Sequence, residues 1–292
     1  MTEGPVWPTA PQRARLAGGR PCGGEPRAGP IARPPMTTLL RAEGVTKAFG
    51  GLVAVNKVEF AIQPHRIVSI IGPNGAGKTA LFNIVTGLDV PESGTVIFRE
   101  RSLVGLRPDE ITASGICRTF QNIRLFANMT AIENVLVGMH TRVGLGLRDV
   151  LARGRRFRTT EESLSRQAAE LLTVVGLRAK ANEVARHLPY GDQRRLEIAR
   201  ALGAGPSLLL LDEPTAGMTQ GEAGLLMALL RRLIGEFHLT VLLIEHNMRV
   251  VMGVSDRVIV LDHGEKIAEG DPTEVRRDPR VIEAYLGRRA HA

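Results

Sequence analysis

The sequence predicts an α/β domain with a mostly parallel sheet, and three patterns support this fold class. An apolar, β-branched run at 67–71 precedes a glycine-rich loop and then a helix-compatible run, so the chain passes from strand to loop to helix. The four leucines at 208–211 are typical of a strand that is buried on both faces, as in a parallel sheet. Leucines at helical spacing between 225 and 233 predict a crossover helix after that strand.

The first 35 residues differ in composition from the rest of the chain. They are rich in proline, glycine, alanine and arginine, and such a segment buries too little apolar surface to offset its ordering entropy. We therefore predict a disordered extension over 1–35; an alternative is that translation starts at Met36. The extension lacks the apolar core of a signal peptide. The remaining residues, about 255, suffice for one large domain over 36–292.

The elements before the glycine-rich loop and directly after it read as strands. Short apolar stretches between Leu39 and Gln63 favour antiparallel strands that lead into the strand at 67–71. A turn signal at 91–94 precedes a further strand at 95–98. The first part of the domain is therefore predicted to carry an antiparallel β subdomain.

A helical subdomain is expected over about 122–187. Its clearest helix is predicted to start near Thr159, where Glu162 three residues on fits the pattern of a capping box, and to stop at Gly176. Strand and helix alternate again after this segment, with further strands at 240–244 and 258–261.

Charge and cysteine content narrow the class of protein. The formal net charge is +8, and a basic cluster lies at 153–158. Such a basic surface is compatible with nucleic acid or anionic lipid, but the cluster contains one aromatic residue, Phe157, and no series of them on which bases could stack. We therefore expect a solvated face and no nucleic-acid partner. The two cysteines, Cys22 and Cys117, form neither a disulfide framework nor a metal-ligand pattern, which favours a reducing compartment. No apolar stretch reaches the length of about 18 residues that spans a bilayer, so a soluble or peripheral protein is expected.

The glycine-rich loop matches the pattern G-x-x-x-x-G-K-[ST] of a phosphate-binding loop. Its glycines allow the backbone to approach phosphate oxygens, and its amides form an anion site at a helix N-terminus. We expect Lys78 to reach the β- and γ-phosphates of a nucleoside triphosphate and Thr79 to hold Mg²⁺. The residues expected to bind the nucleotide here are Gly72, Pro73, Asn74, Gly75, Ala76, Gly77, Lys78, Thr79 and Ala80.

A second motif ends the leucine strand with Asp212 and Glu213. An aspartate at the end of a buried strand beside a phosphate loop can hold Mg²⁺, directly or through water. The glutamate that follows is placed to polarise an attacking water. Together the two motifs predict hydrolysis of the bound nucleotide.

Between these motifs the segment 188–195 and the helical run after it resemble the signature of the ATP-binding-cassette (ABC) ATPases. The resemblance runs from about 39 to 287, with all motifs in the family's order. It implies a P-loop NTPase cassette and ATP as the nucleotide. It also implies that Tyr190, Gly191 and Asp192 contact the γ-phosphate of ATP held by an opposite subunit.

The same resemblance assigns roles to three single residues. Gln121 fits the glutamine of the family's Q-loop, which senses γ-phosphate and Mg²⁺, and His246 fits the switch histidine. Phe49 fits the aromatic residue that stacks on adenine; packing of Phe49 in the core is the alternative. The implied catalytic set is Glu213, His246, Gln121 and Lys78, and the implied Mg²⁺ ligands are Thr79, Gln121 and Asp212.

Finer features are similar to the ATPases of branched-chain amino acid importers. They are the segments 118–126, 244–248 and 281–287, and the last belongs to a family-specific tail over about 265–292. The resemblance implies membrane permeases and a second cassette, homologous or identical, as partners. It implies an extracytoplasmic binding protein as an indirect partner, and a peripheral location on the cytoplasmic face of the membrane. Close relatives act in urea and short-chain amide import; a soluble ATPase or a non-hydrolysing sensor is a more distant alternative.

Five positions depart from the wider family pattern. Ala80 replaces a hydroxyl residue, which removes one hydrogen bond worth about 1 kcal/mol. Pro189 stands where many cassettes carry the signature serine, and Asp192 replaces a glutamine. Thr219 and Gln220 lie in the D-loop, where the wider family has aspartate and the subfamily often Asn-Pro. None of these changes removes a member of the implied catalytic set.

Overall fold

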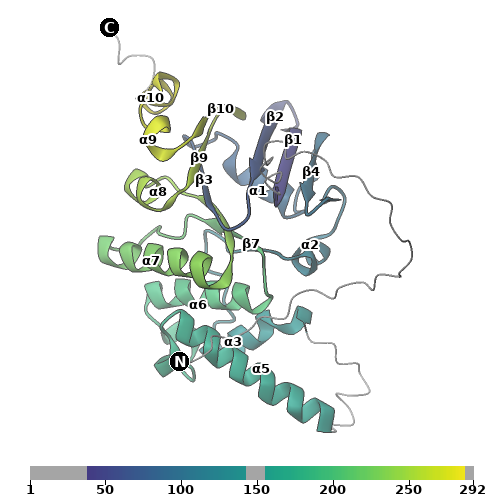
Figure 1. The fold of residues 1–292 in the computed structure, drawn as a ribbon, viewed down its shortest axis with the longest axis vertical. Coiled ribbons are helices and arrows are strands. Elements are labelled where there is room, and N and C mark those ends of the chain that lie inside the picture. Colours follow the sequence, from purple (N-terminus) through teal and green to yellow (C-terminus); the bar gives the residue numbers. More distant parts are fainter. Residues whose placement is uncertain (1–37, 143–154, 287–292) are drawn as a thin grey trace, which may run out of the picture. The chain divides into compact units, whose positions relative to one another are not determined.

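The computed structural model describes residues 38–142 and 155–286 and contains two sheets. The expected extension 1–35, Cys22, the first two residues of the basic cluster and the last six of the tail lie outside the described residues. The smaller sheet has the strand order β2-β1-β4-β5 and the larger β10-β9-β3-β8-β7-β6. The predicted α/β class with an antiparallel β subdomain is confirmed (Figure 1).

All pairings in the smaller sheet are antiparallel. In the larger sheet, strands β9, β3, β8, β7 and β6 run parallel, and only β10 is antiparallel, paired with β9. The strands are β1 (Leu40–Phe49), β2 (Leu52–Ile62), β3 (Ile67–Ile71), β4 (Ser93–Phe98), β5 (Arg101–Ser102), β6 (Ile116–Arg118), β7 (Leu208–Asp212), β8 (Thr240–Ile244), β9 (Arg257–Asp262) and β10 (Glu265–Gly270).

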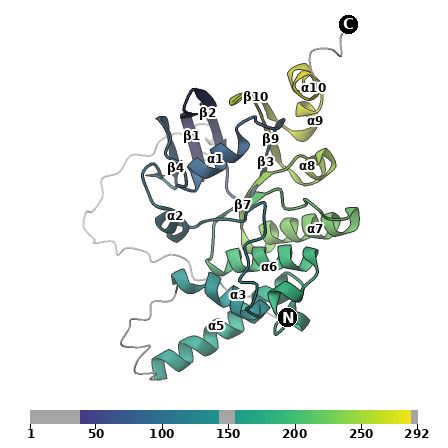
Figure 2. The same cartoon turned by 180° about the vertical axis from the view of Figure 1, so that it is seen from behind.

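The helices fall into groups by the elements against which they pack. Helices α3, α5 and α6 pack on one another, and α7 packs on β8 and α8 (Figures 1 and 2). The helices are α1 (Lys78–Val85), α2 (Pro108–Ser114), α3 (Ala131–Gly138), α5 (Arg155–Val174), α6 (Tyr190–Gly203), α7 (Gln220–Phe237), α8 (Met248–Val254), α9 (Pro272–Val275) and α10 (Pro279–Leu286). Short 3₁₀ turns lie at His140–Arg142, Arg178–Lys180 and Ala185–His187. Within the described ranges, no helix combines the length and apolarity that crossing a membrane requires.

The predicted start of the long helix is wrong. Helix α5 begins at Arg155, so Thr159 lies inside it and is not its N-cap. The pattern Ser/Thr-x-x-Glu also occurs within helices, where it caps nothing. The predicted stop holds, because Gly176 has a φ of 76° two residues beyond the end of the helix.

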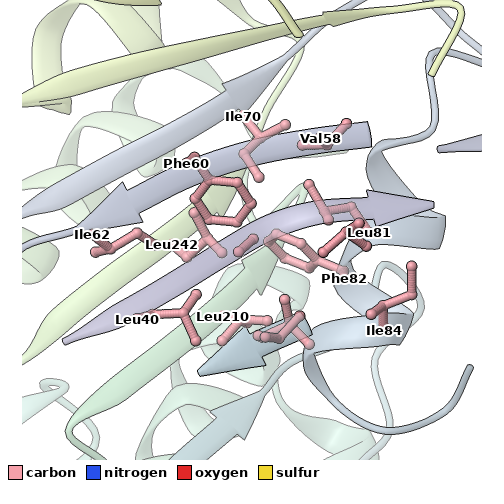
Figure 3. Close-up of a cluster of buried hydrophobic side chains, with 14 of the residues drawn as sticks. Leu40, Val58, Phe60, Ile62, Ile70, Leu81, Phe82, Ile84, Leu210 and Leu242 are labelled. Carbon is pink, nitrogen blue, oxygen red and sulfur yellow. The ribbon is translucent and has the colours of Figure 1, made fainter. Parts of the chain in front are cut away.

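The main core lies between the two sheets and around α1. Alternate residues of the parallel strands contribute to it, since successive side chains point to opposite faces. Thus Ile70 lies in this core, whereas Ile71 lies in a second cluster with residues of α8, α9 and α10. Figure 3 shows residues of the main core, including Leu40, Val58, Phe60, Ile62, Ile70, Leu81, Phe82, Ile84, Leu210 and Leu242. This packing fixes α1, and with it the glycine-rich loop, against the carboxyl ends of the parallel strands.

Candidate functional site

The glycine-rich loop joins β3 to α1, and two of its glycines are required by close backbone contacts. Gly72 has a φ of 152°, and a Cβ there would lie 2.1 Å from the carbonyl oxygen of Leu261. Gly77 has a φ of 96°, and a Cβ there would lie 2.2 Å from the carbonyl oxygen of Ala54. These two glycines therefore hold the loop tightly against β9 and β2. No atom lies within 4 Å of a Cβ built at Gly75, which leaves that side of the loop open.

Lys78 lies back across the loop. Its Nζ donates hydrogen bonds to the carbonyl oxygens of Gly72, at 2.7 Å, and Pro73, at 2.8 Å. Burial lowers the pKa of Lys78 below its usual value, and the negative charges of Glu213 and Asp212 oppose this shift. The ammonium group thus lies between the loop and the two carboxylates.

The donors of the loop fit a bound phosphate. From Asn74 to Thr79, Ala76 is the one residue whose backbone N–H donates to a backbone oxygen of the described chain. The other amides remain available at the N-terminus of α1, where the helix dipole favours an anion. The open side at Gly75 leaves room for that anion to approach.

Glu213 lies between Gln121 and His246 at the end of β7. Nε2 of Gln121 donates to Oε2 of Glu213 at 2.9 Å, and Nδ1 of His246 lies 3.5 Å from Oε1. The backbone of Glu213 has a φ of 47°, a left-handed conformation that is strained for a residue with a side chain. Such strain is typical of functional sites. The structure thus brings together three of the four residues in the implied catalytic set.

Asp212 is buried at the same strand end. Its Oδ2 accepts a hydrogen bond at 2.8 Å from Arg118, and both side chains are less than 10 % exposed, at 6 % for Arg118 and 8 % for Asp212. The expected Mg²⁺ ligands are a hydroxyl, an amide oxygen and a carboxylate, on Thr79, Gln121 and Asp212. Oxygen ligands of this kind, completed by water and phosphate oxygens, suit Mg²⁺. The residues present therefore fit this ion.

The signature residues lie at the start of α6, which packs against α3, α5 and β6. Tyr190 is 44 % exposed. The carboxylate of Asp192 is buried and pairs with Lys180, at 2.7 Å, and with Arg195. Asp192 is therefore held within the subunit by two cations, and Gly191 is buried as well, beside the side chain of Glu222. Of the three signature residues, Tyr190 is the exposed one.

Phe49 ends β1 in the hairpin with β2, where it pairs with Leu52. Its side chain is not packed in the core, because the residue is 49 % exposed. The ammonium group of Lys47 lies 5.2 Å from the centre of its ring. One face of an exposed ring of this kind is suited to stacking on a base.

Three buried charged residues near the site were assigned no role from the sequence. Arg118 binds Asp212, as described above. Arg194 donates to the backbone oxygens of Phe120, at 2.7 Å, and Gln121, so it holds the segment that carries Gln121. Glu245 accepts hydrogen bonds from the backbone of Thr215, at 3.0 Å, and of His246, at 3.2 Å.

A signal for these residues is present in the sequence. Arg118 follows two apolar residues in a short strand, and Glu245 directly follows a strand of apolar residues. A charge in such a place is buried at a cost unless it is paired. A charge at the end of an apolar strand therefore marks both residues in the sequence, but it does not show which groups they bind.

A pocket of about 650 Å³ adjoins the phosphate loop. Its lining combines loop residues with the turn between β9 and β10 and with α10. The lining residues are Pro73, Asn74, Gly75, Ala76, Asp262, His263, Ile267, Arg280, Glu283 and Ala284. Burial raises the pKa of Tyr285 on α10, and a hydrogen bond with the backbone of Gly72 opposes this shift. The C-terminal helix thus contacts the loop that is expected to bind the nucleotide.

Comparison with known proteins places these features in one family. The family described as "ABC transporter" matches residues 55–216, and that described as "Branched-chain amino acid ATP-binding cassette transporter" matches 265–291. The high-affinity branched-chain amino acid transport ATP-binding protein LivG of Salmonella typhimurium is 47 % identical over 249 residues, which cover 85 % of this chain and 98 % of LivG.

Two solved structures of ATP-binding cassettes are similar to this chain and agree with the family match. One is the ADP conformation of MJ1267, an ATP-binding cassette of an ABC transporter, with a TM-score of 0.75 and 32 % identity over 86 % of this chain and 99 % of that chain. The other is a dimeric, post-hydrolysis state of the cassette MJ0796 bound to ADP and Pi, with a TM-score of 0.68 and 29 % identity over 80 % of this chain and 98 % of that chain. The chain therefore belongs to the ATP-binding cassette ATPases of ABC transporters.

Proposed function

We propose that this chain is the ATP-binding and ATP-hydrolysing subunit of an importer for branched-chain amino acids. The proposal of ATP hydrolysis rests on one observation, the position of Glu213 between Gln121 and His246 beside the phosphate loop. The substrate class rests on the relatives, because LivG is named as a branched-chain amino acid transport protein and aligns over 98 % of its length. The match at 265–291 supports the same class.

The nucleotide would lie between two cassettes. Phe49 would stack on adenine, and residues 72–80 with Lys78 would hold the phosphates. Tyr190, Gly191 and Asp192 would face the γ-phosphate held by the second cassette. Since Asp192 is buried against Lys180 and Arg195, and Gly191 is buried too, both would act by fixing the start of α6, and the exposed Tyr190 would make the direct contact.

Hydrolysis would use the carboxylate of Glu213 to orient water for in-line attack on the γ-phosphate. His246, 3.5 Å from Glu213, would complete the environment of that phosphate. When bound by Thr79, Gln121 and Asp212, Mg²⁺ would offset the charge that develops on the transferred phosphoryl group. Lys78 and the loop amides would stabilise the same charge.

The energy of hydrolysis would pass to the membrane through the segment after Gln121. Phe126 is 46 % exposed and Met129 is 38 % exposed. The buried Asn134 fixes this loop from α3, because it accepts from the N–H of Phe126 at 2.9 Å and donates to the carbonyl oxygens of Phe126, at 3.1 Å, and Thr130, at 3.0 Å. A permease helix would lie in a groove along the surface at Leu125 and Phe126, which would place the subunit on the cytoplasmic face of the membrane.

The partners would be two permease subunits and a second cassette, either homologous or a second copy of this chain. The binding protein would act only through the permeases. No nucleic acid takes part in this mechanism. The dimeric cassette structure of MJ0796, bound to ADP and Pi, supports the paired arrangement.

Affinity capture of the full chain from native membranes, with identification by mass spectrometry, tests the proposal. Recovery of multi-span permeases and a second cassette is expected, and their binding protein should then bind leucine, isoleucine or valine. A binding protein specific for urea or amides would correct the substrate class. Recovery of ribosomes or DNA-binding proteins without a permease would replace the importer with a soluble ATPase.

A further inference from the structure

Arg118 lies where the edge strand of the larger sheet meets the expected Mg²⁺ site. It is the last residue of β6 and pairs with Leu210 of the parallel neighbour β7. Asp212 lies two residues beyond Leu210 and therefore projects from the same face of the sheet. The position of Arg118 next to Asp212 is thus a direct result of the register of these two strands.

The guanidinium group of Arg118 is held on several sides. Its NH2 group donates to Oδ2 of Asp212 at 2.8 Å, and its NH1 group donates to Oδ1 of Asn83 at 2.7 Å. It also lies 5.5 Å from the ring centre of Phe82 and 5.1 Å from that of Phe120. The group therefore has one defined position between α1, β7 and the segment that leads to Gln121.

The partner on α1 is itself anchored. Nδ2 of Asn83 donates to Oδ2 of Asp89 at 2.9 Å, which turns Oδ1 of Asn83 toward Arg118. The hydroxyl of Thr86, 3.4 Å from NH1 of Arg118, donates to the carbonyl oxygen of Phe82 at 2.8 Å. The cradle that holds Arg118 is thus built from bonds that do not depend on Asp212.

Packing alone does not account for a charge at this place. Nε of Arg118 is buried and has no hydrogen-bond partner among the described residues. A buried ion pair with an unsatisfied donor is costly, and an apolar side chain of similar size would fill the space beside Phe82 and Phe120 at less cost. The charge therefore has a task at Asp212.

We propose that Arg118 is a positioning residue that fixes the carboxylate of Asp212 for Mg²⁺. Arg118 holds Oδ2, and Oδ1 accepts no hydrogen bond from the described residues, so one oxygen is locked and the other is available to the ion or its water. The same short segment also places Gln121 against Glu213. Residues 118–121 thereby contact both carboxylates at the end of β7 and keep the expected metal ligand and the expected base in fixed relative positions.

This inference rests on the proposed function, and binding measurements separate the two. The dissociation constant of the non-hydrolysable analogue AMP-PNP is measured with EDTA and with Mg²⁺, and their ratio is the gain from the metal. In Arg118→Met we expect this gain to fall about tenfold or more, as is typical when a group that orients a metal ligand is removed. The affinity in EDTA should change by less than about twofold, because the loop and Lys78 are intact.

Milder and control variants make the test decisive. Arg118→Lys keeps the charge and should restore part of the gain, and Asn83→Ala should lower it by removing one anchor of the guanidinium group. Arg124→Met is the matched control, since Arg124 also lies over Phe120, at 3.9 Å, yet it is exposed and makes no contact with Asp212. Circular dichroism melting checks that each variant is folded.

If Arg118→Met is folded and its gain from Mg²⁺ is unchanged, the inference is overturned. If Arg118→Met does not fold, an unchanged gain in both Arg118→Lys and Asn83→Ala overturns it. Equal weakening of binding with and without Mg²⁺ also overturns it, because Arg118 would then support the loop and not the metal ligand. Failure of the wild-type protein to bind AMP-PNP in any condition would instead contradict the proposed function.

Discussion

The side-chain amide of Gln121 lies 2.9 Å from the carboxylate of Glu213 and donates a hydrogen bond to it. Gln121 belongs to the segment after the edge strand β6, whereas Glu213 follows the neighbouring strand β7. The bond therefore links the residue next to the proposed permease surface with the residue proposed to orient water. A γ-phosphate that draws Gln121 away would free one oxygen of Glu213, so nucleotide binding and activation of the base would be coupled.

Replacement of Glu213 by glutamine should abolish turnover and preserve nucleotide binding. The amide cannot accept a proton from water, and general-base catalysis is worth at least about 100-fold in rate. ATP would still be held by the loop and Lys78, so we expect an ATP-bound dimer that accumulates in size-exclusion chromatography with Mg²⁺ and ATP. Undiminished phosphate release by the variant would remove Glu213 from the proposed role.

The glycine-rich loop should be intolerant of a methyl group at Gly77. A Cβ there would lie 2.2 Å from the backbone oxygen of Ala54, and the φ of 96° is strained for alanine. We expect Gly77→Ala to lower the free energy of unfolding by about 3 kcal/mol, as measured by urea titration, and to weaken ATP binding.

The matched control for this substitution is Gly235→Ala in α7, where no atom lies within 4 Å of the added Cβ and the glycine is exposed within a helix. The free energy of unfolding of that variant should rise by about 0.5–1 kcal/mol, because alanine loses less backbone entropy than glycine on folding. If Gly77→Ala proved as stable as the wild type, the close contact between the loop and β2 would not exist in solution.

Burial raises the pKa of Glu197 on α6 above its usual value of 4.5, and a hydrogen bond from the backbone of Arg124 and the charges of Arg194 and Arg200 oppose the shift. The folded state therefore holds a proton more tightly than the unfolded state. Stability from this group is fully present below pH 4.5 and is lost as the pH rises through the folded-state pKa. Glu197→Gln cannot titrate. The stability of the wild type relative to this variant should therefore fall as the pH is raised from 4.5 toward neutrality.

Urea titrations of both proteins at several pH values in that range check this prediction. Each comparison is made at one pH, so titration of all other groups affects both proteins alike. A difference in unfolding free energy that stays constant with pH, or that grows in favour of the wild type as the pH rises, would contradict the raised pKa.

The main elements of the fold could be predicted from the sequence because the buried strands are long apolar runs and the loop motif has a fixed local geometry. Short elements could not. Helices α2, α8, α9 and α10 have four to eight residues, too few for a periodic pattern to distinguish them from loops. The error at Thr159 has a related cause, since a capping pattern cannot show whether the helix continues toward the N-terminus.

The residues of the candidate site also fall into those that the sequence predicts and those that it does not. Residues within contiguous motifs, such as Lys78 and Glu213, can be recognised from their immediate neighbours in sequence. Arg118 and Glu245 depend on pairings between strands that are far apart in the chain, which only the register of β6, β7 and β8 determines. Thr219 illustrates a different limit: its departure from the wider family has a local structural role, because its hydroxyl accepts from the N–H of Glu222 and caps α7.

Glu245 connects the loop after Glu213 with the loop that carries His246. Its side chain is buried, and its two oxygens accept from the backbone and hydroxyl of Thr215 and from the N–H groups of His246, at 3.2 Å, and Asn247, at 3.4 Å. Thr215 lies two residues after Glu213, so this one carboxylate sets the relative position of the proposed base and the switch histidine.

In Glu245→Gln, one acceptor oxygen becomes an NH₂ group that faces a donor, and the hydrogen bonds on that side are lost. We expect turnover of ATP to fall by about tenfold, corresponding to about 1.4 kcal/mol, because misplacement of His246 and Glu213 weakens an interaction made in the transition state. The affinity for ATP should remain near that of the wild type, since neither the loop nor Phe49 contacts Glu245. Steady-state kinetics together with binding of AMP-PNP separate the two quantities. If the variant lost affinity and turnover in equal measure, Glu245 would support the nucleotide site as a whole and not the alignment of the two catalytic groups.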